Sequence, residues 1–314
     1  MRLVFFCLIQ MLFTSLFTEE KFVPKKKVVP KEKVISEEKF VPEEKFVIGN
    51  CPKEGFFSSF CSALNNIMWA EKNGKVPVMH WDETFCHYQK EGWRGSLQPW
   101  EYYFEPVSRL AYEPTDPVYR VYGAPDDFNI PMIFLRDQEK FNELRSAAKN
   151  AIDKYIKVRP EILEKVDSFY QTHMAGAVNI GIHMRGTDRA AKDKWVLPND
   201  MIVEAKKLAA EIPGKVQFFI ATDEEFCLDL AKNSLQGLIY CDSTRSQDGK
   251  PIHVPSPKRT RLAVLGEEVL IEGLLLAKCD YVLHSMSAVP IAVMMMNPSI
   301  KNVYFNPYTY LYKN

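Results

Sequence analysis

The chain has 314 residues, 46% of them hydrophobic, and its 40 basic residues balance its 40 acidic residues. This length accommodates two ordinary domains after a short N-terminal segment, and the hydrophobic share is typical of a globular protein. A net charge of zero offers no chain-wide attraction to nucleic acid or to an anionic membrane surface, so we expect no nucleic-acid partner.

The first 18 residues form a predicted targeting segment. An apolar run, residues 3–17, follows Arg2. Its length suits the core of a signal peptide and is short for a membrane span, but no small-x-small cleavage pattern precedes Glu19. A cleaved signal peptide and an uncleaved N-terminal anchor therefore both stay open. Either one predicts a protein that is exported or attached to a membrane through residues 1–18.

Residues 19–48 divide into five hexapeptides, EEKFVP, KKKVVP, KEKVIS, EEKFVP and EEKFVI. Repeats with this much charge cannot bury a core, and the recurring prolines disfavour helix. We therefore predict an extended, disordered stalk over residues 19–48. A hexapeptide β-helix is the less favoured alternative, because too few coils are present.

The second half of the chain, residues 176–314, alternates regularly between strand and helix patterns. The predicted strands are 177–183, 215–222, 237–242, 281–284 and 301–306, and the predicted helices are 198–210, 224–233, 266–278 and 287–296. Such alternation indicates a parallel sheet with helices on both faces, so we predict a Rossmann-like domain here.

The first half, residues 49–175, is less regular. Helices are predicted at 60–72, 141–156 and 160–174, and a short strand is predicted at 76–81. Residues 84–127, rich in aromatic residues and proline, indicate long loops, which commonly carry binding function. The aromatic run WEYYF, residues 100–104, either stacks on a ligand or fills a core.

The most informative stretch is IGIHMRGTDR, residues 180–189. A buried strand runs directly into Arg185, Gly186 and Asp188, which places these residues at the carboxyl edge of the sheet, where ligands of open α/β folds bind. Arginine can hold a diphosphate with two parallel hydrogen bonds, and glycine lets a ligand approach the backbone. A surface salt bridge at the strand end is the competing interpretation.

Within this stretch, IHMRGTD resembles the H-x-R-x-x-D motif of the fucosyltransferases that use GDP-fucose. The nodulation-type and core α-1,6-fucosyltransferases are the most similar, and the protein O-fucosyltransferases are more distant. Asp223-Glu224 resembles the family's Thr-Asp-Asp run, and EEVLIEGLLLAKCDYVLHSMSAV, residues 267–289, resembles its last motif. The chain departs from the family at Gly186, where the relatives carry a second arginine.

The resemblance implies a GT-B fold, in which two Rossmann-like domains, 49–175 on the acceptor side and 176–314 on the nucleotide-sugar side, face a cleft. It also implies inverting, metal-independent transfer of fucose from GDP-fucose to a glycan or glycoconjugate, with no cofactor. The absence of a D-x-D motif at a strand end agrees with transfer without metal.

Site residues carried over from the family or suggested by position fall into three groups. The donor-binding group is His183, Arg185, Gly186, Asp223, Glu224, Glu272, Ser285 and Ser287. The catalytic group is Arg185, Asp188 and Asp193, with the base expected among the two aspartates. The acceptor-side group is Asn65, Asn66, His80 and Asp82, of which the first two lie in GFFSSFCSALNN, a segment that resembles the opening of these enzymes.

Two alternatives stay open at the level of the sequence. Gly186 keeps open a GT-B transferase that uses another nucleotide sugar. A secreted or anchored glycan-binding protein that has kept the fold and lost turnover is the second alternative. Turnover on an acceptor separates these possibilities, whereas donor binding alone does not.

Overall fold

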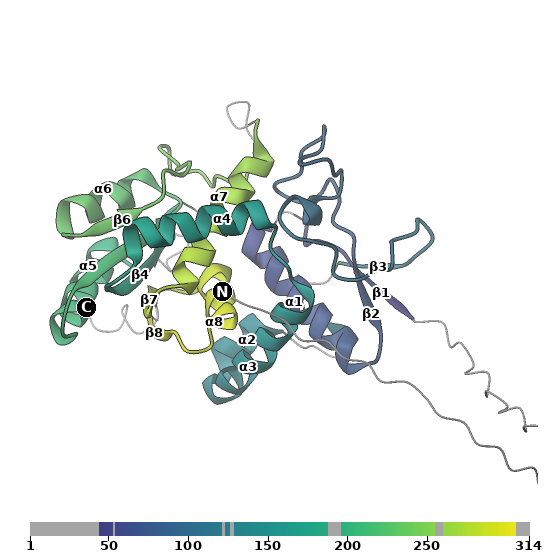
Figure 1. Cartoon of the computed structure of the whole chain (residues 1–314), viewed down its shortest axis with the longest axis horizontal. Coiled ribbons are helices and arrows are strands. Elements are labelled where there is room, and N and C mark those ends of the chain that lie inside the picture. The colour runs from purple at the N-terminus through teal and green to yellow at the C-terminus, as the bar shows by residue number, and fades with distance from the viewer. Residues whose placement is uncertain are drawn as a thin grey trace, which may run out of the picture. The chain divides into compact units, whose positions relative to one another are not determined.

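Figure 1 shows the computed structural model of the chain, which describes residues 44–52, 54–120, 123–125, 129–187, 196–254 and 260–305. The predicted targeting segment and most of the predicted stalk lie outside these ranges. No helix in the described ranges has the length and apolar character needed to cross a bilayer.

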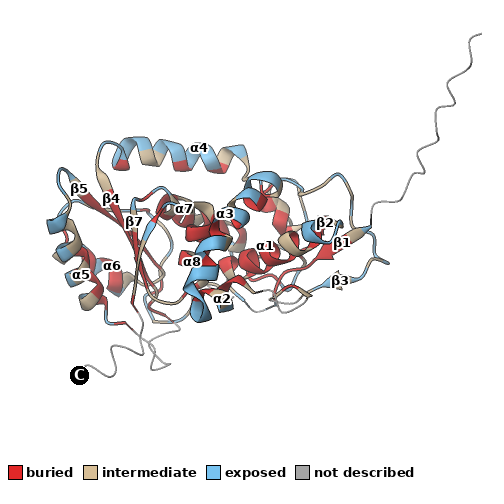
Figure 2. Cartoon of the chain, turned by 90° about the horizontal axis from the view of Figure 1, so that it is seen from below, coloured by how far each residue is buried: buried red, intermediate tan, exposed pale blue. Residues whose placement is uncertain are grey.

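Five parallel strands form the sheet of the C-terminal half, in the order β6-β5-β4-β7-β8. They are β4 (Val178–Met184), β5 (Val216–Thr222), β6 (Leu238–Tyr240), β7 (Tyr281–His284) and β8 (Lys301–Tyr304). Helices α5 (Pro198–Glu211) and α6 (Glu225–Ser234) cover one face, and α7 (Leu262–Ala277) and α8 (Ala288–Met296) cover the other (Figure 2). The predicted α/β architecture with a parallel sheet is confirmed.

The two-residue period of β4 decides which side chains face which helices. Ile180 and Ile182 belong to the core beneath α5 and α6. Gly181 faces α7, where an added Cβ would stand 2.9 Å from Leu276 Cδ2, so glycine allows this helix to lie close to the strand. His183, two residues further on, is therefore directed to the α7 side.

The N-terminal half contains a smaller parallel sheet, in the order β2-β1-β3. Its strands are β1 (Lys45–Ile48), β2 (Val76–Met79) and β3 (Val118–Tyr119). The helices of this half are α1 (Phe56–Lys72), η1 (Pro99–Tyr102), α2 (Ile130–Arg136), α3 (Gln138–Tyr155), α4 (Pro160–Phe169) and the π-helical turn η3 (Tyr170–Met174). Strand pairing is parallel here too, and the described residues of this half form a sheet of three strands.

The structure corrects the predicted end of the stalk. The last four residues of the fifth hexapeptide form β1, the central strand of the small sheet, in which Phe46, Val47 and Ile48 are each at most 2% exposed. This repeat differs from EEKFVP only by Ile48 in place of proline. Isoleucine favours a buried strand and keeps the backbone N–H that proline lacks, so the ordered fold begins before residue 48.

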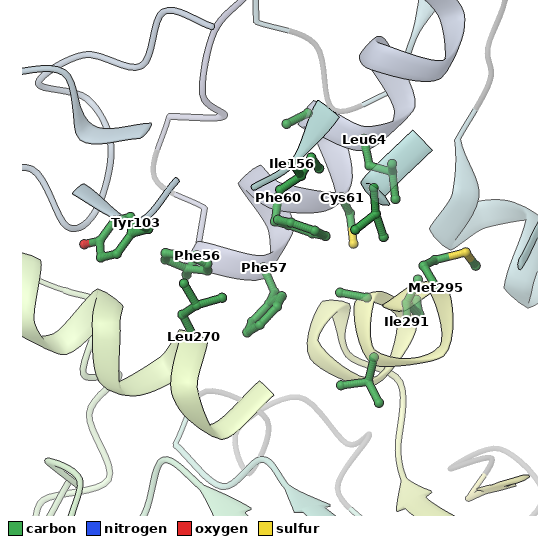
Figure 3. Close-up of a cluster of buried hydrophobic side chains, with 14 of the residues drawn as sticks. Phe56, Phe57, Phe60, Cys61, Leu64, Tyr103, Ile156, Leu270, Ile291 and Met295 are labelled. Atoms are coloured by element: carbon green, nitrogen blue, oxygen red, sulfur yellow. The ribbon is translucent and has the colours of Figure 1, made fainter. Parts of the chain in front are cut away.

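One hydrophobic core extends through both halves. Phe56 and Phe57 of α1 pack with Leu270 of α7, and Leu64 of α1 belongs to the same cluster as Ile291 of α8 (Figure 3). Residues from 44 onward form a single compact unit, so no break in the core accompanies the predicted boundary at residue 175. The division into 49–175 and 176–314 stays a prediction.

The aromatic run at residues 100–104 belongs to this core. Trp100, Tyr102, Tyr103 and Phe104 are fully buried, and Trp100 and Phe104 lie with their ring centroids 4.4 Å apart. These rings fill the interior of the N-terminal half, so the ligand-stacking interpretation of the run is wrong.

Candidate active site

A pocket lies where the carboxyl ends of β4 and β5 meet the first residues of α1. Its lining comes from both halves of the chain: residues 55–58, His87, His183, Arg185, residues 221–223, 243–244, 252–253, 268–269, 272–273 and 288–289. The cavity volume is about 100 Å³. Ligand pockets usually measure about 300–1,000 Å³, so a nucleotide sugar would extend beyond this cavity.

Arg185 is the cation at the end of β4. Its Nη1 donates to Ser287 Oγ at 3.4 Å, and Ser287 is the N-cap residue of α8. A helix N-terminus carries partial positive charge and unpaired N–H groups. The guanidinium and the α8 N-terminus therefore lie together, an arrangement that suits a diphosphate.

Asp223 holds the backbone that carries Arg185. Its Oδ1 accepts from the Gly186 N–H at 2.9 Å, and its Oδ2 accepts from the Thr187 hydroxyl at 2.7 Å. Asp223 also lines the pocket. The structure thus shows it as a support for the loop after β4, and its predicted contact with the nucleotide stays a prediction.

Glu224 is the N-cap residue of α6 and lies against the same loop. A Cβ added to Gly186 would overlap Glu224 Oε2 and stand 2.8 Å from its Cδ. Burial, and secondarily the charge of Asp223, raises the pKa of the Glu224 carboxyl. The close approach of Glu224, which is not part of the pocket lining, therefore favours glycine at position 186.

Glu272 of α7 lies in the pocket wall with its carboxyl group buried. Arg245 Nη2 lies 3.2 Å from Glu272 Oε1. Burial raises the Glu272 pKa to about 7, while Arg245 and a hydrogen bond from the Ser243 side chain act in the opposite direction. A buried carboxyl that titrates near neutral pH in a cleft is a typical feature of functional sites.

Two histidines that the sequence analysis did not single out, His87 and His253, also line the pocket. His87 Nδ1 lies 3.1 Å from the Leu262 carbonyl oxygen. Burial lowers the His87 pKa to about 3, so this imidazole is neutral at physiological pH. It offers the pocket a hydrogen-bonding group without charge.

Arg245 was also missed, although a signal for it was available. It follows β6 in the loop at 241–246, at the same carboxyl edge of the sheet as Arg185 and Asp223. Ligands of open α/β sheets bind at the carboxyl ends of the strands, and this holds for β6 as it does for β4 and β5. No family motif covers the loop after β6, so the sequence pattern did not indicate Arg245.

The predicted donor-binding residues thus separate into three groups. His183, Arg185, Asp223 and Glu272 line the pocket, and Gly186, Glu224 and Ser287 contact those residues or their loop. Ser285 is not in the pocket lining; its carbonyl oxygen lies 3.0 Å from His284 Nδ1. The two predicted catalytic aspartates, Asp188 and Asp193, lie outside the described residues.

Asn65 and Asn66 are absent from the lining of this pocket, and their acceptor role stays a prediction. Both are buried in α1. Asn65 Oδ1 accepts from the Ile130 N–H at 3.1 Å, and Asn66 Nδ2 donates to the Ser62 carbonyl at 2.8 Å. Both side-chain amides form hydrogen bonds inside the fold, as buried amides need to do.

His80 and Asp82 also lie away from this pocket. His80 stacks on Tyr112, with ring centroids 3.7 Å apart, and lines a second cavity with the segment at 106–112. Asp82 pairs with Arg120 at 2.6 Å, measured from Oδ2 to Nη2. An acceptor role at these two residues stays a prediction.

Within the described ranges, no group of three or more His, Cys, Asp or Glu side chains could hold a metal ion. Residues 188–195, which include both predicted catalytic aspartates, lie outside those ranges. Metal independence stays a prediction.

Comparisons with known proteins identify structural neighbours. No protein-family model matches the chain, and no curated protein matches it. NodZ α-1,6-fucosyltransferase co-crystallised with GDP is 20% identical, with 82% of this chain and 93% of that chain covered and a TM-score of 0.53. NodZ from Bradyrhizobium is 21% identical, with 82% and 94% covered and a TM-score of 0.53. NodZ soaked with GDP-fucose is 21% identical, with the same coverage and a TM-score of 0.52.

These neighbours are fucosyltransferases, the family that the sequence motifs resemble. At this level of identity the likeness establishes the fold. The predicted fold, α/β with parallel sheets in the manner of a GT-B fucosyltransferase, is confirmed to that extent.

Proposed function

We propose that this protein is a glycosyltransferase that moves fucose from GDP-fucose to a glycan or glycoconjugate acceptor, with inversion at the sugar carbon and without a metal ion. The observation that carries the proposal is Arg185. Its guanidinium lines the pocket at the end of β4 and donates to Ser287 at the N-terminus of α8. A fixed cation beside a helix N-terminus supplies the positive charge that a departing diphosphate needs.

The reaction is a single displacement. The acceptor hydroxyl oxygen bonds to C1 of fucose, the bond from C1 to the β-phosphate oxygen breaks, and GDP leaves with that electron pair. Arg185 stabilises the charge that grows on the diphosphate, most strongly in the transition state. The hydroxyl proton passes to a carboxylate, for which we propose Asp188 or Asp193.

Glu272 supports the choice of a guanine nucleotide. An ionised carboxylate only accepts hydrogen bonds. Guanine presents two neighbouring donors, the N1–H and the 2-amino group, whereas the uracil edge alternates one donor with two acceptors. Glu272 is buried in the pocket wall, so a base that offers its carboxylate no N–H donor leaves it without hydration and without a hydrogen bond. A base with two neighbouring donors is therefore favoured over uracil.

Two further parts of the proposal rest on the sequence. We propose that the N-terminal half recognises the acceptor, with His80 and Asp82 on that side. We also propose that residues 1–18 direct export or membrane attachment. An enzyme so placed would need a compartment supplied with GDP-fucose.

The test is calorimetric titration of the full chain with GDP, GDP-fucose, UDP and ADP, followed by a transfer assay on an acceptor panel. Arg185→Ala should weaken GDP binding by about 10- to 100-fold, the range for a lost hydrogen bond to a charged group. Arg136→Ala, at an exposed position of α2, is the matched control and should bind as the wild type does.

Three results would contradict parts of the proposal separately. Absence of nucleotide binding to well-folded protein would favour the glycan-binding alternative. Preference for another sugar nucleotide would overturn the fucose assignment and leave the fold intact. Loss of transfer in a chelator, restored by a divalent cation, would overturn metal independence.

A further inference from the structure

The loop at 241–246 is fastened to α7 by two glutamates one helical turn apart. Glu268 Oε2 accepts from the Thr244 N–H at 2.8 Å, and Glu272 Oε1 accepts from Arg245 Nη2 at 3.2 Å. Glu268 and Glu272 both line the pocket. The conformation of this loop therefore determines where the Glu272 carboxyl group lies.

The Arg245 side chain is only 3% exposed and is held at three points. Nη2 donates to the Cys241 carbonyl at 2.8 Å as well as to Glu272, and Nη1 donates to the Ser243 carbonyl at 2.9 Å. Its buried Nε has no hydrogen-bond partner within the described residues. A buried guanidinium with one donor unsatisfied is costly to the fold, and such groups commonly serve a function.

The same loop connects Glu272 with the backbone that carries Arg185. The Ser246 N–H donates to the Asp223 carbonyl oxygen at 2.9 Å, and the Asp223 carboxylate holds Gly186 and Thr187. A continuous set of hydrogen bonds thus runs from the proposed phosphate end of the pocket to Glu272. These hydrogen bonds hold Glu272 at a fixed distance from the backbone that carries Arg185.

We propose that Arg245 is a positioning residue that keeps the Glu272 carboxylate ionised and fixed in the pocket wall, so that the pocket selects a nucleobase with two neighbouring N–H donors. This inference rests on the proposed function, because it concerns the nucleotide of the same donor. Arg245 itself touches Glu272 and the loop, and acts on the ligand through Glu272.

The charges around Glu272 determine the direction of the effect. The nearby groups are Arg245 and the Ser243 side chain, which favour the ionised form, Glu268 and Asp223, which disfavour it, and the pocket-lining Arg185, His183, His87 and His253. With Arg245 present, the Glu272 pKa is about 7. Removal of the cation raises this pKa further, so the carboxyl group becomes neutral at pH 7 and presents an O–H to the donors of the base.

The experiment measures GDP affinity of the full chain between about pH 5.5 and pH 8.5, a range that spans the ionisation of such a carboxyl. Affinity should fall as the pH drops through about 7 in the wild type. In Arg245→Met the midpoint should rise by about one pH unit or more, and affinity at pH 7 should fall about tenfold. Arg245→Lys should recover part of both effects. Lys206→Met, an exposed position on α5, is the control.

A comparison of GDP with IDP, which lacks the 2-amino group, tests the selection itself. The wild type should prefer GDP, and Arg245→Met should lose most of that preference. Glu272→Gln should bind GDP weakly without the pH dependence, and adding Arg245→Met to that background should change little.

The outcomes separate this inference from the proposed function. If Arg245→Met weakens GDP equally with Glu272 and with Gln at position 272, the role of Arg245 is structural and the inference is overturned. It is overturned as well if the midpoint and the preference over IDP are unchanged. If the wild type binds no nucleotide while remaining folded, the proposed function fails first.

Discussion

Gly186 and Glu224 compete for one space at the carboxyl edge of the sheet: a Cβ on Gly186 would overlap Glu224 Oε2 and stand 2.9 Å from Glu224 Cβ. These are the two positions at which the chain departs from the fucosyltransferase motifs that it resembles, where relatives carry a second arginine and a second aspartate. The structure links the two departures, since the longer acid fills the volume that a side chain at 186 would need.

We predict that Gly186→Ala destabilises the protein by about 1–3 kcal/mol, the usual cost of forcing extra volume into a packed site. It should also weaken GDP binding, because the Gly186 N–H that Asp223 holds would be displaced together with the neighbouring Arg185. Urea unfolding and GDP titration measure the two effects.

The matched control is the double variant Gly186→Ala, Glu224→Gly. Glycine is accepted at a helix N-cap, so α6 should tolerate the second change. It removes both the carboxylate and the Cβ that the new methyl group would meet. Stability should return close to that of Glu224→Gly alone, and an undiminished loss would show that the overlap is not the cause.

The C-terminal sheet could be predicted from the sequence because its strands and helices alternate with clear boundaries. The predicted strand 281–284 coincides with β7. The predicted helices of this half begin and end within a few residues of the observed helices. The small sheet could not be predicted in the same way. Its central strand continues a charged repeat, and only Ile48 in place of proline distinguishes it.

For the candidate site, Arg185 and Asp223 could be predicted because each follows the carboxyl end of a strand. The residues that they contact could not be predicted in this way. The contact between Arg245 and Glu272 joins a loop to a helix 27 positions away, and no local pattern encodes it. The buried roles of Asn65 and Asn66 likewise depend on α2, a helix that the sequence did not predict.

The buried imidazole of His284 should make stability depend on pH. It is paired in register with His183 at the end of β7, and burial lowers its pKa to about 4. The unfolded chain takes up the proton near the ordinary value of 6.5. The stabilisation is therefore fully present above pH 6.5 and is lost as the pH falls from there toward 4.

We predict that the wild type loses about 2 kcal/mol more stability than His284→Asn when the pH is lowered from about 7 to about 5. Urea unfolding at the two pH values measures the difference. His87, whose pKa burial also lowers, is present in both proteins, so its contribution cancels. Equal losses in the two proteins would show that His284 does not stay neutral in the folded state.

Arg145 of α3 secures the far end of the helix whose N-terminus meets Arg185. Its Nε donates to the Met294 carbonyl at 3.3 Å, and its Nη2 donates to the carbonyls of Asn297 at 3.2 Å and Ile300 at 2.9 Å. These are carbonyls at the C-terminus of α8 and in the turn that follows. Helix-terminal carbonyls have no partner within the helix and need one from elsewhere.

Arg145→Met should therefore lower the free energy of unfolding by about 2–4 kcal/mol, because several buried carbonyls would lose a charged donor together. Arg136→Met, on the exposed side of α2, should change stability by less than about 0.5 kcal/mol. Chemical denaturation of both variants under one condition measures the contrast. A loss at Arg145 no larger than that at Arg136 would show that water replaces the guanidinium.

Gly273 allows α1 to approach α7 at the pocket. A Cβ at this position would overlap Phe57 Cζ and stand 2.8 Å from its Cε2. Figure 3 shows the Phe57 ring between the helices, and both residues line the pocket. We predict that Gly273→Ala destabilises the protein by about 1–3 kcal/mol. Helix propensity alone would favour alanine by about 1 kcal/mol, so the expected sign is opposite to that of propensity.

The second variant, Gly273→Ala with Phe57→Leu, separates packing from other effects. Leucine is smaller than phenylalanine and leaves room for the added methyl group, so the Gly273→Ala change should cost less in the Phe57→Leu background than in the wild type. Thermal or urea unfolding of the four proteins gives the coupling free energy between the two positions. A coupling near zero, or a stabilising Gly273→Ala, would show that Phe57 moves aside freely and that this glycine is not needed for the contact between the halves.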